Sequence, residues 1–228
     1  MDRGNPRDAG EWYACQSPEL TGAAAEAVKF AENFNIPVVT TLMGVGAIPD
    51  SHPLSLQWLG MHGTIGANYA ANESDLFISM GARFDDRVTG NAEKFARRAK
   101  IVHVDIDDSE INKNKTADLG ILADVGEVLK AMNSAPEFKE RAPWFEQVNK
   151  WKEDHPFTFK SVPGRLHAQH VIKTLSKMTK GDAVIVPGVG QHQIVMLGNV
   201  IEDGTGGTGG TDGLHIGRVV VIEAVHGP

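Results

Sequence analysis

Apolar residues in the first half of the chain gather in short, nearly continuous runs, and the segments between these runs have helical spacing. Runs of this kind, rich in Val, Ile and Leu, are typical of strands that are buried on both faces of a sheet. The predicted strands are 36–41, 76–80, 101–106 and 119–122. The predicted helices are 18–31, 64–72, 92–98 and 125–132. Over residues 11–133 this alternation predicts an α/β fold, a parallel sheet with helices on both faces.

Residues 134–166 interrupt the pattern with four prolines and predict a linker. Trp144 and Trp151 stand seven residues apart on a short helix within it, a spacing that favours one packed face. An α/β pattern then resumes in residues 167–228, with a helix over 167–179 and a strand over 183–186. The apolar residues of that helix that we expect to face inward are Val171, Ile172, Leu175 and Met178.

The last part of the chain combines a glycine-rich segment with one more apolar run. Residues 204–213, GTGGTGGTDG, are low in complexity and predict a flexible tail. Residues 217–225, GRVVVIEAV, predict a strand. A strand needs a neighbour, so this one either folds back on the sheet of the same chain or meets a partner chain.

Composition and charge limit the classes of function. The net charge of −7 and the absence of a Lys/Arg run argue against nucleic-acid binding. The single cysteine, Cys15, excludes a disulfide framework. No signal pattern opens the chain and no apolar run has the length of a membrane span, so we expect a cytoplasmic protein. The scattered histidines and acids predict no metal site.

Candidate chemistry follows the strands, because open parallel sheets bind ligands at the carboxyl ends of their strands. Glycines and acids gather at these points, above all in 81–90 (GARFDDRVTG) and in 105–110 (DIDDSE). Glycines let backbone N–H groups approach a phosphate, and acids accept ribose hydroxyls, so together they predict a nucleotide or dinucleotide site. The two acids between two arginines in 81–90 also suit a salt-bridged turn, and both interpretations stay open.

Several stretches in combination resemble one family. LGMHGT (59–64), GARFDDRVTG (81–90) and VDID followed by EI (104–111) are similar to the central domain of the large subunit of acetolactate synthase (acetohydroxyacid synthase), a thiamine-diphosphate enzyme family. GDAVIVPGVGQHQ (181–193) resembles the start of that family's third domain. The resemblance implies an FAD-binding central domain at 11–133 and a truncated start of the thiamine-diphosphate-binding domain at 167–228, ending in an unrelated glycine-rich tail.

The resemblance also implies a reaction and its cofactors. Members of the family condense pyruvate with a second 2-keto acid in branched-chain amino-acid biosynthesis, and they use thiamine diphosphate, Mg²⁺ and a largely structural FAD. The implied FAD contacts are Thr41, Leu42, Met43, Leu59, Gly60, Met61, His62, Gly63, Thr64, Gly81, Ala82, Arg83, Asp85, Val88, Asp105, Ile106, Asp107, Glu110, Ile111, Ala123 and Asp124. The implied thiamine diphosphate contacts are Val189, Gly190, Gln191 and His192.

Three residues carry the implied substrate contacts. Arg87 matches the family's arginine for the carboxylate of the second keto acid, which suits a planar, permanently charged guanidinium. Asp86 would orient Arg87, and Met61 would line the substrate channel. The four charges of 81–90 would then serve two ligands, with flavin on the Arg83 side and the keto acid at Arg87.

Departures from the family pattern limit what the chain is expected to do. The family's first domain, with its activating glutamate, and the motif that holds Mg²⁺ and diphosphate do not occur, and residues 14–17 lack the family's Gly-Gly-Gly turn. We therefore expect a synthase fragment, in a homo-oligomer or as a synthase subunit, that is inactive alone. The alternatives are a non-catalytic FAD- or nucleotide-binding module and a protein that docks onto an intact synthase.

Overall fold

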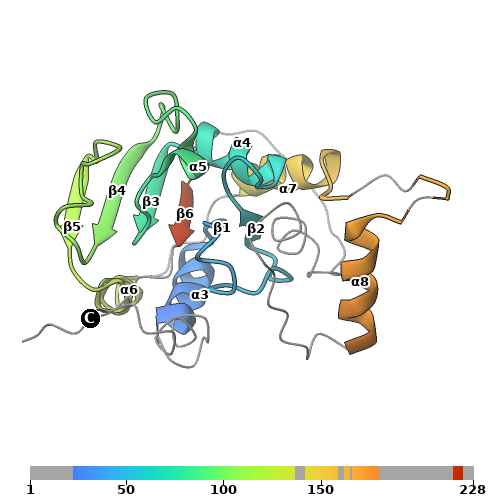
Figure 1. Cartoon of the computed structure of the whole chain (residues 1–228). Coiled ribbons are helices and arrows are strands. Elements are labelled where there is room, and N and C mark those ends of the chain that lie inside the picture. The colour runs from blue at the N-terminus through green and yellow to red at the C-terminus, as the bar shows by residue number, and fades with distance from the viewer. Residues whose placement is uncertain (1–22, 137–141, 159–161, 165, 180–217, 223–228) are drawn as a thin grey trace, which may run out of the picture.

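A six-stranded parallel sheet forms the centre of the computed structural model, which describes residues 23–136, 142–158, 162–164, 166–179 and 218–222 (Figure 1). The strands are β1 (Val38–Thr40), β2 (Ser55–Trp58), β3 (Leu76–Met80), β4 (Lys100–Asp105), β5 (Leu119–Leu122) and β6 (Arg218–Ile222). Their order in the sheet is β2-β1-β6-β3-β4-β5, and every pair is parallel. This confirms the predicted fold class.

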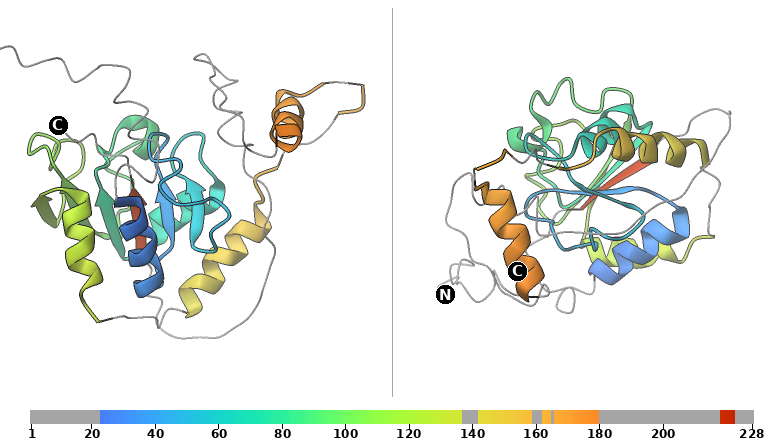
Figure 2. Two further views of the ribbon diagram at one scale, coloured as in Figure 1. Left: turned by 90° about the horizontal axis from the view of Figure 1, so that it is seen from below. Right: turned by 90° about the vertical axis from the view of Figure 1, so that its right-hand side faces the viewer.

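Helices cover the sheet on both faces, as Figures 1 and 2 show. Helices α3 (Ala23–Phe34) and α6 (Val125–Asn133) pack side by side on one face. Helices α4 (Ile65–Glu73) and α7 (Ala142–Asp154) pack together on the other. The short α5 (Asp86–Thr89) follows β3, and α8 (Ala168–Thr179) stands apart from the sheet.

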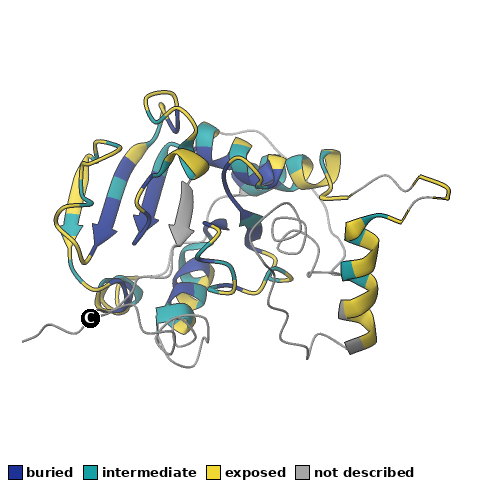
Figure 3. Ribbon diagram, in the orientation of Figure 1, coloured by how far each residue is buried: buried dark blue, intermediate teal, exposed yellow. Residues whose placement is uncertain are grey.

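Two hydrophobic clusters make the core, one on each face. Successive residues of a strand point to opposite faces, so Val38 and Ile78 enter the cluster under α3 and α6, while Val39 and Phe77 enter the cluster under α4 and α7. In Figure 3, β3 and most of β4 are dark, the colour of buried residues. The near-continuous apolar runs of the sequence reflect this burial on two faces.

Small residues let α4 and α7 approach closely. Gly66, Ala67, Ala70 and Ala71 are buried on α4, and a Cβ at Gly66 would make an ordinary van der Waals contact, at 3.7 Å, with Lys152 Cγ on α7. The rings of Trp144 and Trp151 meet edge to face, 5.7 Å apart; Trp144 belongs to the buried core on this side, and the partly buried Trp151 packs against it. The prediction that the two tryptophans mark one packed face is confirmed.

The predicted helix over 92–98 is wrong, because this segment forms turns. Ala96 adopts a left-handed φ of 46°, which ends any helix there, and its N–H donates to Asn72 Oδ1 at 3.1 Å. Lys115 Nζ donates to the carbonyls of Ala92 (2.8 Å) and Phe95 (2.7 Å). Contacts from distant segments therefore satisfy backbone groups that a helix would pair within itself.

Other elements differ from the sequence prediction in detail. Strand β2 and helix α5 were not predicted, and α3 runs three residues beyond 31, to Phe34. The inward-facing prediction for α8 is wrong for Val171, Leu175 and Met178, which are 46, 41 and 77% exposed. The predicted strand at 183–186 lies outside the described residues.

Candidate functional site

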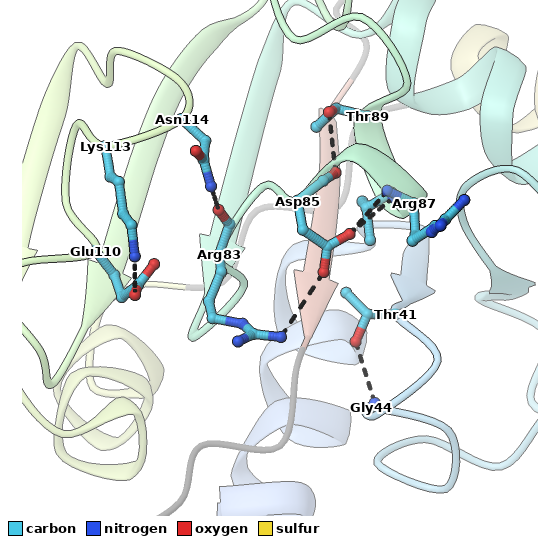
Figure 4. Close-up of polar contacts among 10 residues, drawn as sticks. Thr41, Gly44, Arg83, Asp85, Arg87, Thr89, Glu110, Lys113 and Asn114 are labelled. Atoms are coloured by element: carbon cyan, nitrogen blue, oxygen red, sulfur yellow. Dashed lines mark hydrogen bonds and ion pairs between the residues drawn. The ribbon is translucent and has the colours of Figure 1, made fainter.

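The order of the strands gathers three of the predicted stretches at one edge of the sheet. The carboxyl ends of β1, β3 and β4 lead into Thr41, Gly81 and Ile106, respectively, and only β6 stands between β1 and β3. Figure 4 shows Thr41, Arg83, Asp85 and Glu110 around this edge. Because parallel strands end on the same side, segments far apart in the sequence become neighbours here.

The loop 59–64 joins this group through backbone contacts. Leu59 N donates to Thr40 O at 2.8 Å, and Met61 N donates to Arg87 O at 2.8 Å. Gly60, with a φ of 112°, lies directly against the Arg87 carbonyl, and a Cβ added there would collide with it. A glycine is needed at this point for its conformation and for its small size.

Asp85 organises the turn that carries Arg87. Its side chain is the N-cap of α5 and accepts hydrogen bonds from Arg87 N (3.0 Å) and Val88 N (3.1 Å). The Thr89 hydroxyl donates to the Asp85 carbonyl at 3.0 Å. The carboxylate also lies 3.8 Å from Arg83 Nη2, in an ion pair that is largely exposed.

The four charges of 81–90 therefore divide into two sets. Arg83 and Asp85 form the exposed ion pair, as the salt-bridged-turn interpretation expects, whereas Asp86 and Arg87 are exposed on α5. The ion pairs found within the described ranges include none between Asp86 and Arg87. In Figure 4 the Arg83 and Arg87 side chains point in different directions, so the two guanidinium groups face different parts of the edge.

Carboxylates follow β4 at the same edge. Asp105 is buried and accepts a hydrogen bond from Asp107 N at 2.9 Å. Hydrogen bonds from Ser109 lower the pKa of Asp107. Glu110 Oε1 pairs with Lys113 Nζ at 2.6 Å, while Glu110 Oε2 is buried and has no hydrogen-bond partner among the described residues. An unpaired, buried acceptor of this kind is costly unless a ligand or water supplies a donor.

His103, which was not among the predicted site residues, lies beneath this edge. The side chain is fully buried on β4, edge-on to the Phe84 ring at 5.1 Å, with Nε2 3.7 Å from Asp105 Oδ2. Burial lowers the pKa of His103, although the neighbouring carboxylates of Asp105 and Glu110 act in the opposite direction. The signal that could have marked it is a histidine within an otherwise apolar strand run.

Apolar side chains at the carboxyl edge are unusually exposed. Leu42, Met61, Ile106 and Leu122 follow or end different strands and loops, and they are 40, 58, 39 and 57% exposed. Each of these side chains is large, and a ligand that covers it would remove apolar surface from contact with water, which is favourable. Together with the glycine contacts and the carboxylates, they give this edge the mixture of apolar and polar groups that is typical of small-molecule and cofactor sites.

The predicted site residues differ in how far they are buried. Those that are buried are Thr41, Leu59, Gly60, Thr64, Gly81, Ala82 and Asp105. Those of intermediate exposure are Met43, Gly63, Asp85, Val88, Glu110, Ile111 and Ala123. Those that are exposed are Leu42, Met61, His62, Arg83, Asp86, Arg87, Ile106, Asp107 and Asp124. The residues predicted to contact thiamine diphosphate, Val189 to His192, lie outside the described ranges.

Two of the predicted FAD contacts, Thr64 and Asp124, also cap helices. Thr64 is the buried N-cap of α4: its hydroxyl accepts from Ala67 N (3.0 Å) and donates to Leu56 O (2.8 Å). Asp124 is the N-cap of α6 and accepts from Glu127 N at 3.1 Å. Capping fixes the first turn of each helix, so substitution of either residue will alter stability.

Neither a cluster of metal-binding side chains nor a membrane-spanning helix occurs in the part of the chain that the structure describes. No group of three or more His, Cys, Asp or Glu side chains there could hold a metal ion. None of the helices there is long and apolar enough to cross a membrane.

A doubly covered parallel sheet with glycines, carboxylates and exposed apolar side chains at its carboxyl edge is the arrangement of a cofactor-binding α/β domain. Residues 16–132 match the family model "Thiamine pyrophosphate enzyme, central domain", and the chain belongs to this family. The family resemblance of the sequence is thereby confirmed.

Curated relatives give the same result. The chain is 48% identical to acetolactate synthase 1, chloroplastic, of Nicotiana tabacum over 172 residues, which are 73% of this chain and 26% of the relative. It is 46% identical to acetolactate synthase 2, chloroplastic, of Zea mays over 175 residues, 74% of this chain and 27% of the relative. The chain thus spans about a quarter of the length of these relatives.

Proposed function

We propose that this chain is the central, FAD-binding part of an acetolactate synthase large subunit, with the central domain at 11–133, and that it makes no acetolactate alone. The observation that carries the proposal is the contact between 59–64 and 81–90, which joins two stretches of the family pattern through Met61 N and Arg87 O at 2.8 Å. The whole enzyme would condense pyruvate with a second 2-keto acid.

The residues at the carboxyl edge fit FAD. Glu110 Oε2 is a buried acceptor without a hydrogen-bond donor among the described residues, and it would accept a hydrogen bond from a ribose hydroxyl. Arg83, exposed on its side of the turn, would meet the phosphates, since a guanidinium is suited to phosphate oxygens. The exposed apolar side chains of Leu42 and Met61 would pack against the flavin ring.

Arg87 would hold the carboxylate of the second keto acid. Asp85 fixes the backbone of the turn, and Met61 binds the Arg87 carbonyl, so the guanidinium projects from a rigid base into solvent. The proposed role of Asp86 is to orient Arg87 once a ligand is present. Thiamine diphosphate, when bound, supplies the means to decarboxylate pyruvate; its proposed contacts are Val189 to His192, and the described residues offer no cluster for Mg²⁺.

The two arginines allow a sharp test of this division. Loss of the phosphate contact in Arg83→Gln should weaken FAD binding about tenfold, as expected for a charge-assisted contact. The matched control, Arg87→Gln, should leave FAD affinity unchanged because Arg87 serves the other ligand. Quenching of flavin fluorescence measures both dissociation constants. Equal affinities in all three proteins would contradict the assignment of Arg83.

Catalysis by the chain alone is tested directly with pyruvate, thiamine diphosphate, Mg²⁺ and FAD. We expect no acetolactate from this chain by itself, because it spans about a quarter of the length of the acetolactate synthases that it matches. A pyruvate-dependent turnover by the pure chain would contradict this part of the proposal without affecting FAD binding.

Assembly and location complete the proposal. We propose a homo-oligomer or a synthase subunit in the cytoplasm, whereas the names of the plant relatives place those proteins in the chloroplast. Gel filtration with light scattering measures the assembly, and cell fractionation measures the location. A strictly monomeric chain that does not associate with a synthase would contradict the proposed assembly. Recovery of the chain from an organelle would contradict the proposed location.

A further inference from the structure

Strand β6 breaks the sequential order of the sheet. It comes from the C-terminal end of the chain, yet it lies between β1 and β3, where Figure 1 shows it in red. Its backbone pairs with both neighbours in one register: Val220 is opposite Val38 on one side and Ile78 on the other. The pairing extends over Val38 to Thr40 on β1 and over all five residues of β3.

The position that β6 holds is normally that of a first strand. In the common doubly wound order 3-2-1-4-5-6, the central strand is the first in the sequence and leads into the first helix. If β1 to β5 are taken as strands 2 to 6 of that order, β6 stands in the place of strand 1. A right-handed crossover through α3 would bring a strand upstream of α3 to this same place.

Two segments of one chain are therefore candidates for one gap. The segment upstream of α3 includes 11–16, EWYACQ, which has no β-branched residue. Residues 218–222, RVVVI, contain four in succession. A central parallel strand is enclosed on both faces and favours β-branched residues, so the C-terminal segment is the better occupant by composition.

The strand in this gap joins the two parts of the sheet. Among the described strands, β6 alone links the pair β2-β1 to the set β3-β4-β5 by backbone hydrogen bonds. An empty gap would leave the facing N–H and C=O groups of β1 and β3 unpaired inside the protein, which is strongly unfavourable. It would also separate Thr41 from Gly81 at the candidate cofactor edge.

We propose that the gap between β1 and β3 is an acceptor site for a parallel, β-branched strand, and that residues 218–222 of the same chain fill it in place of a strand upstream of α3. The C-terminal segment then takes over the central position of the sheet, beside the edge where the cofactor candidates meet. Pairing of β6 with β1 and β3 involves backbone groups alone, so it does not depend on whether the chain binds FAD.

Hydrogen exchange of the intact chain tests the occupant without any substitution. Amides within 218–222 should exchange about a hundredfold or more slower than in a free peptide of the same sequence, as those of β3 should. Protection of 11–16 with free exchange at 218–222 would overturn the proposal. Cysteines placed at Val38 and Val220, which are opposite each other, and joined by a short thiol cross-linker show which chain supplies the strand: a cross-link within one chain supports filling by the same chain, and a cross-link that joins two chains on a denaturing gel overturns it.

A proline within β6 provides a second, independent test in the full chain. Val220→Pro removes a central N–H and should lower the melting temperature by about 10 °C, whereas the matched control Val225→Pro, three residues beyond β6, should not. The Val220→Pro chain should then bind a synthetic peptide of residues 216–224 and regain its melting temperature, while the same peptide carrying the proline should have no effect. Equal melting temperatures for both variants, or no gain on adding the peptide, would overturn the acceptor site.

Discussion

Met61 and Arg87 are joined by a backbone hydrogen bond of 2.8 Å from the Met61 N–H to the Arg87 carbonyl. The bond forms because Gly60, with a φ of 112°, brings the loop directly against that carbonyl. A methionine proposed to line the substrate channel and an arginine proposed to bind the substrate carboxylate are thus held by the main chain. Their relative position does not depend on side-chain conformation.

Gly60→Ala should break this junction. The added Cβ would collide with the Arg87 carbonyl and lie 3.0 Å from Val88 Cα, in a backbone conformation that alanine rarely adopts. We expect a loss of about 3 kcal/mol in the free energy of unfolding, measured by urea denaturation. The control is Gly90→Ala, which has a φ of 61° but no atom within 4 Å, and which should cost only about 1 kcal/mol. Equal losses in the two variants would show that the close approach at Gly60 carries no energy.

His103 should make stability depend on pH. Burial lowers its pKa below the ordinary value of 6.5, so the folded state resists a proton that the unfolded state accepts. The contribution of neutral His103 to the free energy of unfolding is therefore fully present above pH 6.5. It is lost as the pH falls below 6.5, by at most about 1.4 kcal/mol per pH unit. His103→Gln should flatten the fall in the free energy of unfolding between pH 7 and pH 5. His62→Gln, at an exposed histidine, should keep the wild-type slope. A slope unchanged in His103→Gln would contradict the prediction.

Asp50 should make the free energy of unfolding fall as the pH rises, which is the opposite of the effect of His103. Burial raises its pKa from 3.8 to about 6, so its contribution is fully present below pH 3.8 and is lost as the pH rises through 6. Asp50→Asn removes the buried charge and should stabilise the chain at pH 7.5, by about 1 to 3 kcal/mol. At pH 4 the gain should vanish. Thermal unfolding at both pH values measures the effect, with Asp108→Asn, at an exposed aspartate, as the control. A loss of stability at pH 7.5 would mean that the Asp50 carboxylate has a favourable partner.

The sequence predicted the elements whose own residues decide their structure. Strand β3 was predicted with both ends correct because its apolar run is bounded by a polar residue and a glycine. Strand β2, SLQW, was not predicted, since it is short, contains polar residues and has Gln57 at a positive φ of 64°. Its first carbonyl, of Ser55, accepts a hydrogen bond from Lys152 on α7, a contact that no local pattern reveals.

The candidate site was predictable as a set of stretches but not as an arrangement. The resemblance of 59–64 and 81–90 to one family identified both stretches, whereas the Met61–Arg87 bond that joins them depends on the folded backbone. The sequence offered two neighbours for the C-terminal apolar run, and the structure places it in the sheet of its own chain. The burial of His103 beneath the edge follows from packing against Phe84, which sequence spacing does not encode.

The most direct test of the proposed function is the visible absorption spectrum of the purified chain after incubation with FAD and gel filtration. We predict that a flavin band elutes with the protein at close to one FAD per chain. Circular dichroism of the same fraction shows whether the chain is folded. A folded chain that elutes without flavin would contradict the proposal that the edge formed by Thr41, Gly81 and Asp105 is an FAD site.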